Sequence, residues 1–312
     1  MDYRYFLAVF DSGSLAAAGE RLHIAPSAVS RQIALLEESI GVPLFERRPR
    51  GMEPTAAGSA LAHHALRASL EEQALLSELR GGDYPGARVI RLVSTEGLSR
   101  YFLPHVLIQH YQQNPAFQYV LEVMSPLECA EKVKRGDADM GLTFSTAPTE
   151  GVDIRYSSRS AIRALMRIGH PLSALKSLPM RALLPYPLAL TPKGTTLRQL
   201  FDLVCEMEGL HFNHVMTCNY SGAIHEFVRH SDTIAFGSAI SQRVNDGSDL
   251  VSVPLSNPRF ADRSIQVLTM PKRTLPTALE GFIETLIGCL TGNRGPTTFI
   301  SSDGGTLSAE VS

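Results

Sequence analysis

The stretch "IAPSAVSRQIALLEESIGVPLFERRPRG", residues 24–51, decides how the fold of this 312-residue chain is interpreted. After Pro26, apolar residues recur at helical spacing, so they would lie along one side of a helix that ends at Gly41. This apolar stripe consists of Val29, Ile33, Leu36 and Ile40. The residues opposite or beside it are short or polar: Ser27, Ser30, Arg31, Gln32, Ala34 and Glu38. The sequence therefore predicts a helix with one buried side and one lightly charged side.

The lightly charged side suits contact with DNA. Short hydroxyl, amide and guanidinium groups can hydrogen-bond to base edges and phosphates in a major groove, which is wide enough to admit a helix. We expect Ser27, Ser30, Arg31, Gln32 and Ala34 to face double-stranded DNA. An ordinary surface helix also has a polar side, so the neighbouring segments must decide between the two interpretations.

Two shorter helices are predicted before this one. An apolar stripe for the first helix consists of Tyr3, Phe6, Leu7 and Phe10. Residues 11–14 form a turn in which Ser14 is placed to cap a second helix, whose small residues permit close packing. Three short helices with a tight turn before the last are typical of a helix-turn-helix.

Arginines follow the third predicted helix. Residues 43–46 and 52–54 would form two extended arms around an arginine-rich tip, which is the pattern of a β-wing. We expect Arg47, Arg48 and Arg50 to reach phosphates or a minor groove, although such a run can also be a solvated loop. Residues 1–60 carry six Arg and seven Asp or Glu, so each head should bind DNA modestly and require more than one copy.

The remainder of the chain indicates a different fold class. Residues 55–79 have strong helix propensity, and a Gly- and Pro-rich boundary follows at 81–86. Strands are predicted at 89–93, 119–123, 140–144, 188–190, 214–218, 233–236 and 265–269. Helices are predicted at 98–112, 126–135, 195–208, 221–230 and 276–290. This alternation indicates an α/β fold with parallel sheets.

Polar residues gather where the predicted strands end and helices begin. Ligands of α/β sheets collect at this edge, where helix N-termini present free N–H groups that favour small anions such as carboxylates. The candidate ligand-binding residues are Thr95, Glu96, Gly97, Ser125, Phe144, Thr191, Thr195, Thr196, Asn219 and Ser221. Each hydroxyl could instead be a simple helix cap. Glu96 would repel an anion unless it points away or pairs with Arg100.

Composition narrows the function classes. The net charge is −2, no apolar run approaches the length of about 20 residues that spans a bilayer, and residues 1–4 lack the basic and then apolar pattern of a signal peptide. Four scattered cysteines without a Cys-x-x-Cys pair indicate reduced thiols in a cytoplasm. No nucleophile elbow, phosphate-binding loop or metal-spaced histidine cluster is present, so we expect neither an enzyme nor a cofactor or metal.

Several motifs in the first 58 residues form one long pattern without insertions or deletions. They are YFLAV at 5–9, GSL at 13–15, SAVSRQI at 27–33, GVPLFER at 41–47 and PTAAG at 54–58. Together they resemble the winged helix-turn-helix of LysR-type transcriptional regulators, and the remainder fits that family more loosely to about residue 290. Pro26 departs from the family, in which many members carry Gln or Ser there.

The resemblance implies a domain order. It places a winged helix-turn-helix at 1–58, a linker and dimerisation helix at 55–80 and a hinge at 81–87. An effector domain similar to periplasmic solute-binding proteins would follow, with two Rossmann-like subdomains at 88–160 plus 263–290 and at 161–262. Residues 291–312 would be a disordered tail.

The resemblance also implies a function: a sequence-specific regulator whose cleft between the subdomains binds a small-molecule effector, often an organic acid. The implied partners are double-stranded DNA, RNA polymerase and further copies of the chain, which form a homodimer and then a homotetramer. The loop at 194–198 lacks the cysteine of peroxide-sensing members, and bulky residues at 230–234 would narrow the cleft. A transport solute-binding protein and an enzyme are the disfavoured alternatives.

Overall fold

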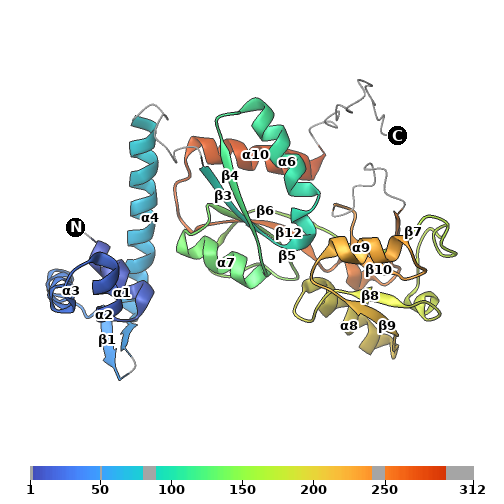
Figure 1. Ribbon diagram of the computed structural model, residues 1–312, viewed down its shortest axis with the longest axis horizontal. Coiled ribbons are helices and arrows are strands. Elements are labelled where there is room, and N and C mark those ends of the chain that lie inside the picture. Colours follow the sequence, from blue (N-terminus) through green and yellow to red (C-terminus); the bar gives the residue numbers. More distant parts are fainter. Residues whose placement is uncertain (1–2, 50, 80–88, 241–249, 293–312) are drawn as a thin grey trace. The chain divides into compact units, whose positions relative to one another are not determined.

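The computed structural model describes residues 3–49, 51–79, 89–240 and 250–292 (Figure 1). The chain forms two compact units, Met1–Ala87 and Arg88–Ser312. The first unit is mainly helical, whereas the second combines mixed sheets with helices in two halves. The predicted fold class, a helix-turn-helix head followed by an α/β domain, is therefore confirmed.

Three helices, a two-stranded wing and a long helix make up the first unit. They are α1 (Arg4–Ser12), α2 (Leu15–Leu22), α3 (Pro26–Ile40), β1 (Phe45–Arg48), β2 (Gly51–Pro54) and α4 (Ala56–Leu79). Val29, Ile33 and Leu36 are buried as predicted, together with Phe6 of α1. Ile40 was expected to be buried with them but is 37 % exposed, because it is the last residue of α3, where the chain leaves the three-helix core.

The turn between α2 and α3 is tight. A Cβ atom at Gly19 would come within 2.7 Å of the carbonyl oxygen of Ile24, so only glycine allows this approach. His23 ends α2 in the left-handed region, with φ 56°, and reverses the chain. At the other end of α2, Ser14 is the N-cap, and its hydroxyl accepts from the N–H of Ala17.

The wing is attached to the helices through its base. β1 and β2 pair antiparallel, with Arg48 opposite Gly51. The N–H of Met52 donates to the carbonyl oxygen of Gly13 at 2.8 Å. Gly51 has φ 137°, and a Cβ atom there would lie 2.4 Å from that same oxygen. Glycine at residue 51 is therefore required for the wing to lie against the turn before α2.

Five strands form the sheet of the first half of the second unit, in the order β4-β3-β5-β12-β6. The strands are β3 (Val89–Ser94), β4 (Gln118–Val123), β5 (Met140–Ser145), β6 (Asp153–Arg159) and β12 (Ser264–Thr269). The helices are α5 (Glu96–Ser99), α6 (Phe102–Gln113), α7 (Pro126–Arg135) and α10 (Thr277–Thr291). Helices α6 and α10 lie on one face of this sheet and α7 lies on the other (Figure 1). Side chains of α6 and α10 pack into one core cluster with the strands, and those of α7 pack into another.

The second half contains two smaller sheets. β7 (Ile162–Arg167) lies between β10 (Ala235–Ser238) and β11 (Leu250–Pro254), and β8 (Leu188–Leu190) pairs with β9 (His214–Thr217). The helices are η1 (Met180–Leu183), α8 (Thr196–Glu208), α9 (Ser221–Arg229) and η3 (Pro258–Ala261). A bridge between Leu188 and Ile234 connects the two sheets, whose core contains Phe201, Phe236 and Phe260.

The prediction of parallel sheets is only partly right. β3 is parallel to β4 and β5, but β12 is antiparallel to β5 and β6, and β7 is antiparallel to both of its neighbours. The chain passes between the halves without a crossover helix, so parallel pairing is not imposed on these strands. β6, β7 and β11 were not predicted; β6 alternates exposed and half-buried residues at a sheet edge and lacks a continuous apolar run.

All four cysteines are free thiols. Burial raises the pKa of Cys129 to about 12 and that of Cys205 to about 11, so both thiols stay protonated at neutral pH. Cys129 is buried and Cys205 is half-buried, and the free thiols agree with the reduced state that the spacing of the cysteines predicted. In the described part of the chain, every helix is too short or too polar to span a membrane.

Replacing Gly58 by Ala is expected to destabilise the first unit by more than about 2 kcal/mol, because the new methyl group would lie 2.0 Å from the backbone oxygen of Leu44. The same change at Gly281 of α10 meets no atom within 4 Å and should stabilise the second unit by up to about 1 kcal/mol. Scanning calorimetry of the full chain measures both effects. If the two substitutions change the unfolding temperatures of their units equally, the close packing described for Gly58 is contradicted.

Candidate functional site

The side of α3 that faces away from the helical core carries the predicted DNA-contacting residues. Ser27, Arg31, Gln32 and Ala34 are exposed, and Ser30 is half-buried. The guanidinium of Arg31 makes no hydrogen bond or ion pair with any residue that the structure describes. This side of the helix is therefore accessible to a partner, while the opposite side holds the first unit together.

The wing arginines differ in their surroundings. Arg47 donates from Nη2 to the hydroxyl of Ser30 at 3.4 Å, which brings the wing and α3 together at one surface. Arg48 pairs with Glu46 and, through Nε, with Glu53 at 3.3 Å, so its charge is largely compensated. Arg50, the third predicted wing contact, lies outside the described residues.

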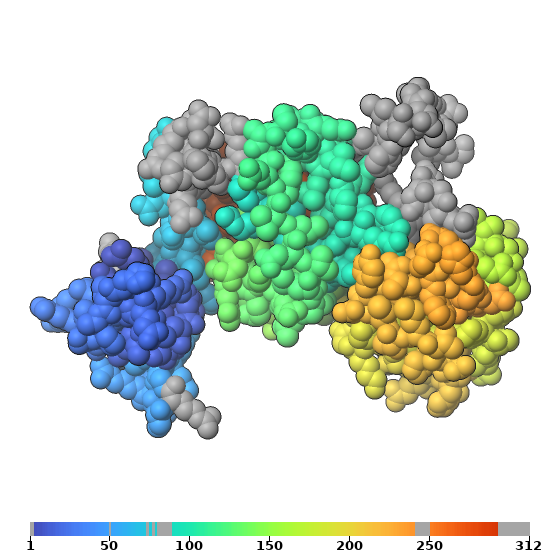
Figure 2. Space-filling view, in the orientation of Figure 1, coloured from blue at the N-terminus to red at the C-terminus, as the bar shows by residue number. Residues whose placement is uncertain are grey.

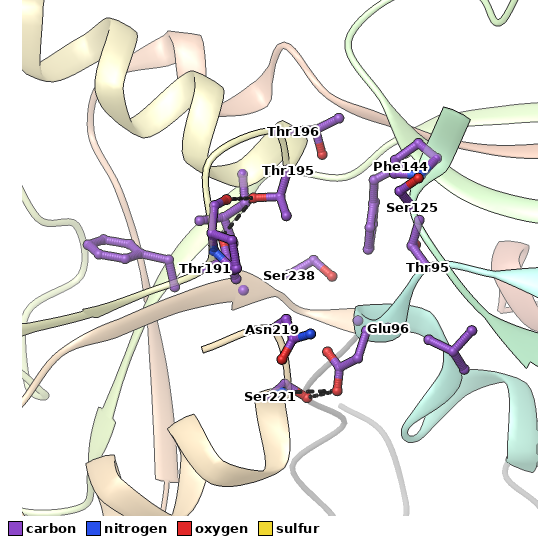
Figure 3. A pocket seen from close by; sticks show the side chains of 18 of the residues that line it. Thr95, Glu96, Ser125, Phe144, Thr191, Thr195, Thr196, Asn219, Ser221 and Ser238 are labelled. Carbon is purple, nitrogen blue, oxygen red and sulfur yellow. Dashed lines mark hydrogen bonds between the residues drawn. The ribbon is translucent and has the colours of Figure 1, made fainter. Parts of the chain in front are cut away.

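A cavity of about 590 Å³ lies between the two halves of the second unit. Figure 2 shows the surface of the second half, yellow to orange, adjoining the green surface of the first half. All ten predicted ligand-binding residues line the cavity: Thr95, Glu96, Gly97, Ser125, Phe144, Thr191, Thr195, Thr196, Asn219 and Ser221. Thr95, Ser125 and Phe144 face the threonines of the second half across it (Figure 3).

Most of the cavity hydroxyls already have partners within the chain. Ser125 forms a capping box with Glu128 at the start of α7, and the hydroxyl of Thr195 accepts from the N–H of Arg198 in α8. Thr195 also shares a hydrogen bond of 2.7 Å with Thr191. The capping interpretation therefore holds for Ser125 and Thr195. Thr196, by contrast, makes no hydrogen bond with a described residue.

Glu96 forms a link across the cavity. Its Oε1 accepts from the N–H of Ser221 at 2.9 Å and from the hydroxyl of Ser221 at 2.7 Å (Figure 3). Glu96 starts α5 in the first half, whereas Ser221 starts α9 in the second half. Of the two arrangements considered from sequence, pairing with Arg100 is wrong. The carboxylate instead fills the N-terminus of α9, where a helix favours negative charge.

Arg263 is a cavity residue that sequence reasoning missed. It is 4 % exposed, and its Nε donates to the carbonyl oxygen of Ser160 at 3.2 Å. The guanidinium lies 4.1 Å above the ring of Phe144, and its Nη2 has no hydrogen-bond partner among the described residues. Burial lowers the pKa of Arg263 to about 9, which still leaves the group charged at neutral pH.

The antiparallel course of β12 explains why Arg263 was missed. Ser264, the first residue of β12, pairs with Ser145, the last residue of β5. The amino end of β12 therefore lies at the same sheet edge as the carboxyl ends of β3 and β5. The rule that ligands bind at the carboxyl ends of parallel strands does not point to Arg263, because this residue lies before the amino end of a strand. The available sequence signal was a single arginine directly before the predicted strand 265–269.

The predicted narrowing of the cleft by residues 230–234 is wrong. None of them lines the cavity. His230 points outward, with a side chain that is 71 % exposed, and its Nε2 lies 2.9 Å from Glu226. Asp232 pairs with Arg167 at 2.6 Å on the surface. Within the described residues, no cluster of His, Cys, Asp and Glu could hold a metal ion.

Two family models match the chain. Residues 1–59 match "Bacterial regulatory helix-turn-helix protein, lysR family", and residues 85–288 match "LysR substrate binding domain". Among curated relatives, the uncharacterized HTH-type transcriptional regulator YfeR of Shigella flexneri is 25 % identical over 280 residues, which cover 89 % of each chain.

Solved structures share the fold. A full-length OxyR variant from Pseudomonas aeruginosa matches with a TM-score of 0.62 at 18 % identity, and the match covers 91 % of this chain and 92 % of that one. Full-length CbnR in complex with its target DNA matches with a TM-score of 0.52 at 21 % identity, and the match covers 93 % of this chain and 99 % of that one.

Replacing Thr195 by Val should lower the free energy of unfolding of the ligand-free second unit by about 1 kcal/mol, because the N-cap of α8 is lost. Thr196→Val should change it by less than about 0.5 kcal/mol, since that hydroxyl has no partner in the described chain. Calorimetric unfolding without ligand measures the difference. If Thr196→Val lowers the free energy of unfolding as much as Thr195→Val does, the distinction between a capping hydroxyl at Thr195 and an unpartnered hydroxyl at Thr196 is wrong.

Proposed function

The chain belongs to the LysR family of DNA-binding transcriptional regulators, with a substrate-binding effector domain, and we propose that a small organic acid in its cavity controls how strongly it binds its promoter DNA. The observation that carries this proposal is a buried arginine without a carboxylate partner, Arg263, in a cavity lined by hydroxyl groups. A ligand carboxylate would provide the missing counter-charge.

The DNA-reading part of the proposal rests on α3 and the wing. Ser27, Arg31 and Gln32 are exposed on a helix whose other side is buried, which is the arrangement of a helix that enters a major groove. Ser30 and Arg47 lie together at the junction of α3 and the wing. We assign base contacts to the helix and phosphate contacts to Arg47, with a weaker contribution from Arg48.

We also propose that the protein acts as a homodimer that assembles into a homotetramer. Three leucines near the end of α4 remain exposed within the first unit: Leu75 at 55 %, Leu76 at 41 % and Leu79 at 73 %. Covering them with a second α4 would remove apolar surface from water. Two or more heads per assembly would also compensate for the few uncompensated arginines of each head.

Regulation would follow from the location of the cavity. A ligand that contacts both halves of the second unit stabilises one arrangement of these halves over others through its different affinity for them. In an oligomer, that change would alter the spacing of the heads and the bend of the promoter, and so the access of RNA polymerase. We place this action in the cytoplasm, where the promoter lies.

Arg31→Ala should weaken binding to an interrupted palindrome upstream of the gene by about tenfold or more, because one groove contact is lost. Arg259→Ala is the matched control: it removes a surface arginine of the second unit, paired with Asp262 at 3.1 Å, and should change affinity by less than about twofold. Fluorescence anisotropy with labelled duplex measures both. If the Arg31 variant binds DNA as tightly as the unsubstituted protein, the proposal that α3 contacts the DNA is wrong.

Arg47→Ala should weaken DNA binding more than Arg48→Ala, because the Arg48 charge is already balanced by Glu46 and Glu53. The slope of log affinity against log salt concentration should fall by about 0.9 for the Arg47 variant and by clearly less for the Arg48 variant. Salt titrations of both variants test this order. The reverse order would mean that the wing rearranges its ion pairs on DNA.

A further inference from the structure

Four helices of the second unit begin at the cavity, the short α5 and the longer α7, α8 and α9, and the chain itself supplies an acceptor to each of the three longer ones. At α7 the acceptors are Ser125 and Glu128, and at α8 the acceptor is Thr195. Helix N-termini attract anions because their first N–H groups lack partners within the helix. In α7 and α8, residues at the start of the helix itself accept these hydrogen bonds.

At α9 the acceptor comes from the other half of the unit. Glu96 receives both hydrogen bonds from Ser221 on one oxygen, Oε1. Its second oxygen, Oε2, accepts no hydrogen bond from a described residue. Glu96 therefore occupies the position that a ligand carboxylate would take at α9, and it leaves an ionised oxygen at the cavity that can only accept hydrogen bonds.

Arg263 offers the opposite chemistry in the same cavity. Its buried guanidinium packs on Phe144 and forms no ion pair with any carboxylate of the described chain. In particular, Arg263 and Glu96 both line the cavity without forming an ion pair with each other. Among the groups that remain for a ligand are thus one buried donor, the Arg263 guanidinium with an aromatic ring beneath it, and one carboxylate oxygen of Glu96.

We propose that the cavity binds a ligand with one acidic group, held by Arg263, and a separate ammonium or hydroxyl group that donates to Glu96. Glu96 is then a specificity-determining residue that excludes dianions, because a second ligand anion would meet a carboxylate where α9 would otherwise attract it. This inference rests on the proposed function and refines its organic acid to an amino acid or hydroxy acid.

Sulfate tests the charge argument without depending on the shape of an organic skeleton. Its affinity for the full chain can be measured by titration calorimetry at constant ionic strength. Glu96→Gln keeps an acceptor for Ser221 but removes the negative charge, so sulfate should bind this variant about tenfold tighter than the unsubstituted protein. Arg263→Lys, which keeps a buried cation but loses the planar fork, should bind sulfate at least about tenfold more weakly than the unsubstituted protein.

Glu122→Gln is the control, because it neutralises a carboxylate of the same half that pairs with Lys132 at 2.8 Å and does not line the cavity. Its sulfate affinity should stay within about twofold of that of the unsubstituted protein. Equal sulfate affinity in the unsubstituted protein and the Glu96 variant would overturn the proposal. Sulfate binding to none of these proteins would also overturn it, because Arg263 would then not be an anion receptor.

Matched organic acids test the ligand class. Succinate is compared with 4-aminobutanoate and 4-hydroxybutanoate, and phthalate with 2-aminobenzoate and 2-hydroxybenzoate. For any skeleton that binds, the amino or hydroxy acid should be preferred at least about tenfold over the diacid, and Glu96→Gln should remove most of that preference. A diacid preferred by the unsubstituted protein would overturn the proposal.

DNA binding separates this inference from the proposed function. If the full chain binds its promoter but the unsubstituted protein and the Glu96→Gln variant bind sulfate equally well, only the ligand inference fails. If sulfate and the matched acids behave as expected but the chain binds no DNA, the regulatory function fails and the ligand class stands.

Discussion

The chain passes between the two halves of the second unit twice, and hydrogen bonds join the two connecting segments at one point. The first crossing joins β6 to β7, and the second joins η3 to β12. The N–H of Ser160 donates to the carbonyl oxygen of Arg263 at 2.8 Å, and Nε of Arg263 donates to the carbonyl oxygen of Ser160 at 3.2 Å. Both covalent connections between the halves pass through this pair, so a rotation of one half against the other must bend the chain here. Arg263 also lines the cavity, so a ligand anion would contact the pivot itself.

Glu96 and Ser221 add a second link between the halves, one made by side chains rather than by the chain's course. A ligand can shift the balance between two arrangements only by binding them with different affinity. A molecule that touches Arg263 alone would neutralise a buried charge in either arrangement. A molecule that also donates to Glu96 senses whether α5 and α9 lie close together. Under the proposed function, the link at Glu96 would convert occupancy of the cavity into a preference for one arrangement.

The parts of the structure that sequence predicted are those set by local rules. The buried stripe of α3, the cap at Ser125 and the cap at Thr195 each depend on residues within one or two helical turns. The partner of Glu96 lies 125 residues away, and no local pattern could identify it. Arg263 was passed over because an antiparallel β12 places its amino end at the ligand edge, which a parallel-sheet prediction assigns to carboxyl ends only.

The head raises the complementary question of how a nearly neutral surface can hold a polyanion. The charge of Arg48 is paired with Glu46 and Glu53, whereas Arg47 bonds only to the hydroxyl of Ser30 and Arg31 has no partner in the described chain. A head with so few available cations gains little from non-specific attraction to phosphates. Its binding must then come from geometry, with α3 fixed on its core by the tight turn at Gly19 and the wing fixed by Gly51. With the DNA contacts proposed above, the close backbone approaches at these two glycines would serve sequence discrimination as well as stability, because they fix the positions of the polar groups on α3 and the wing.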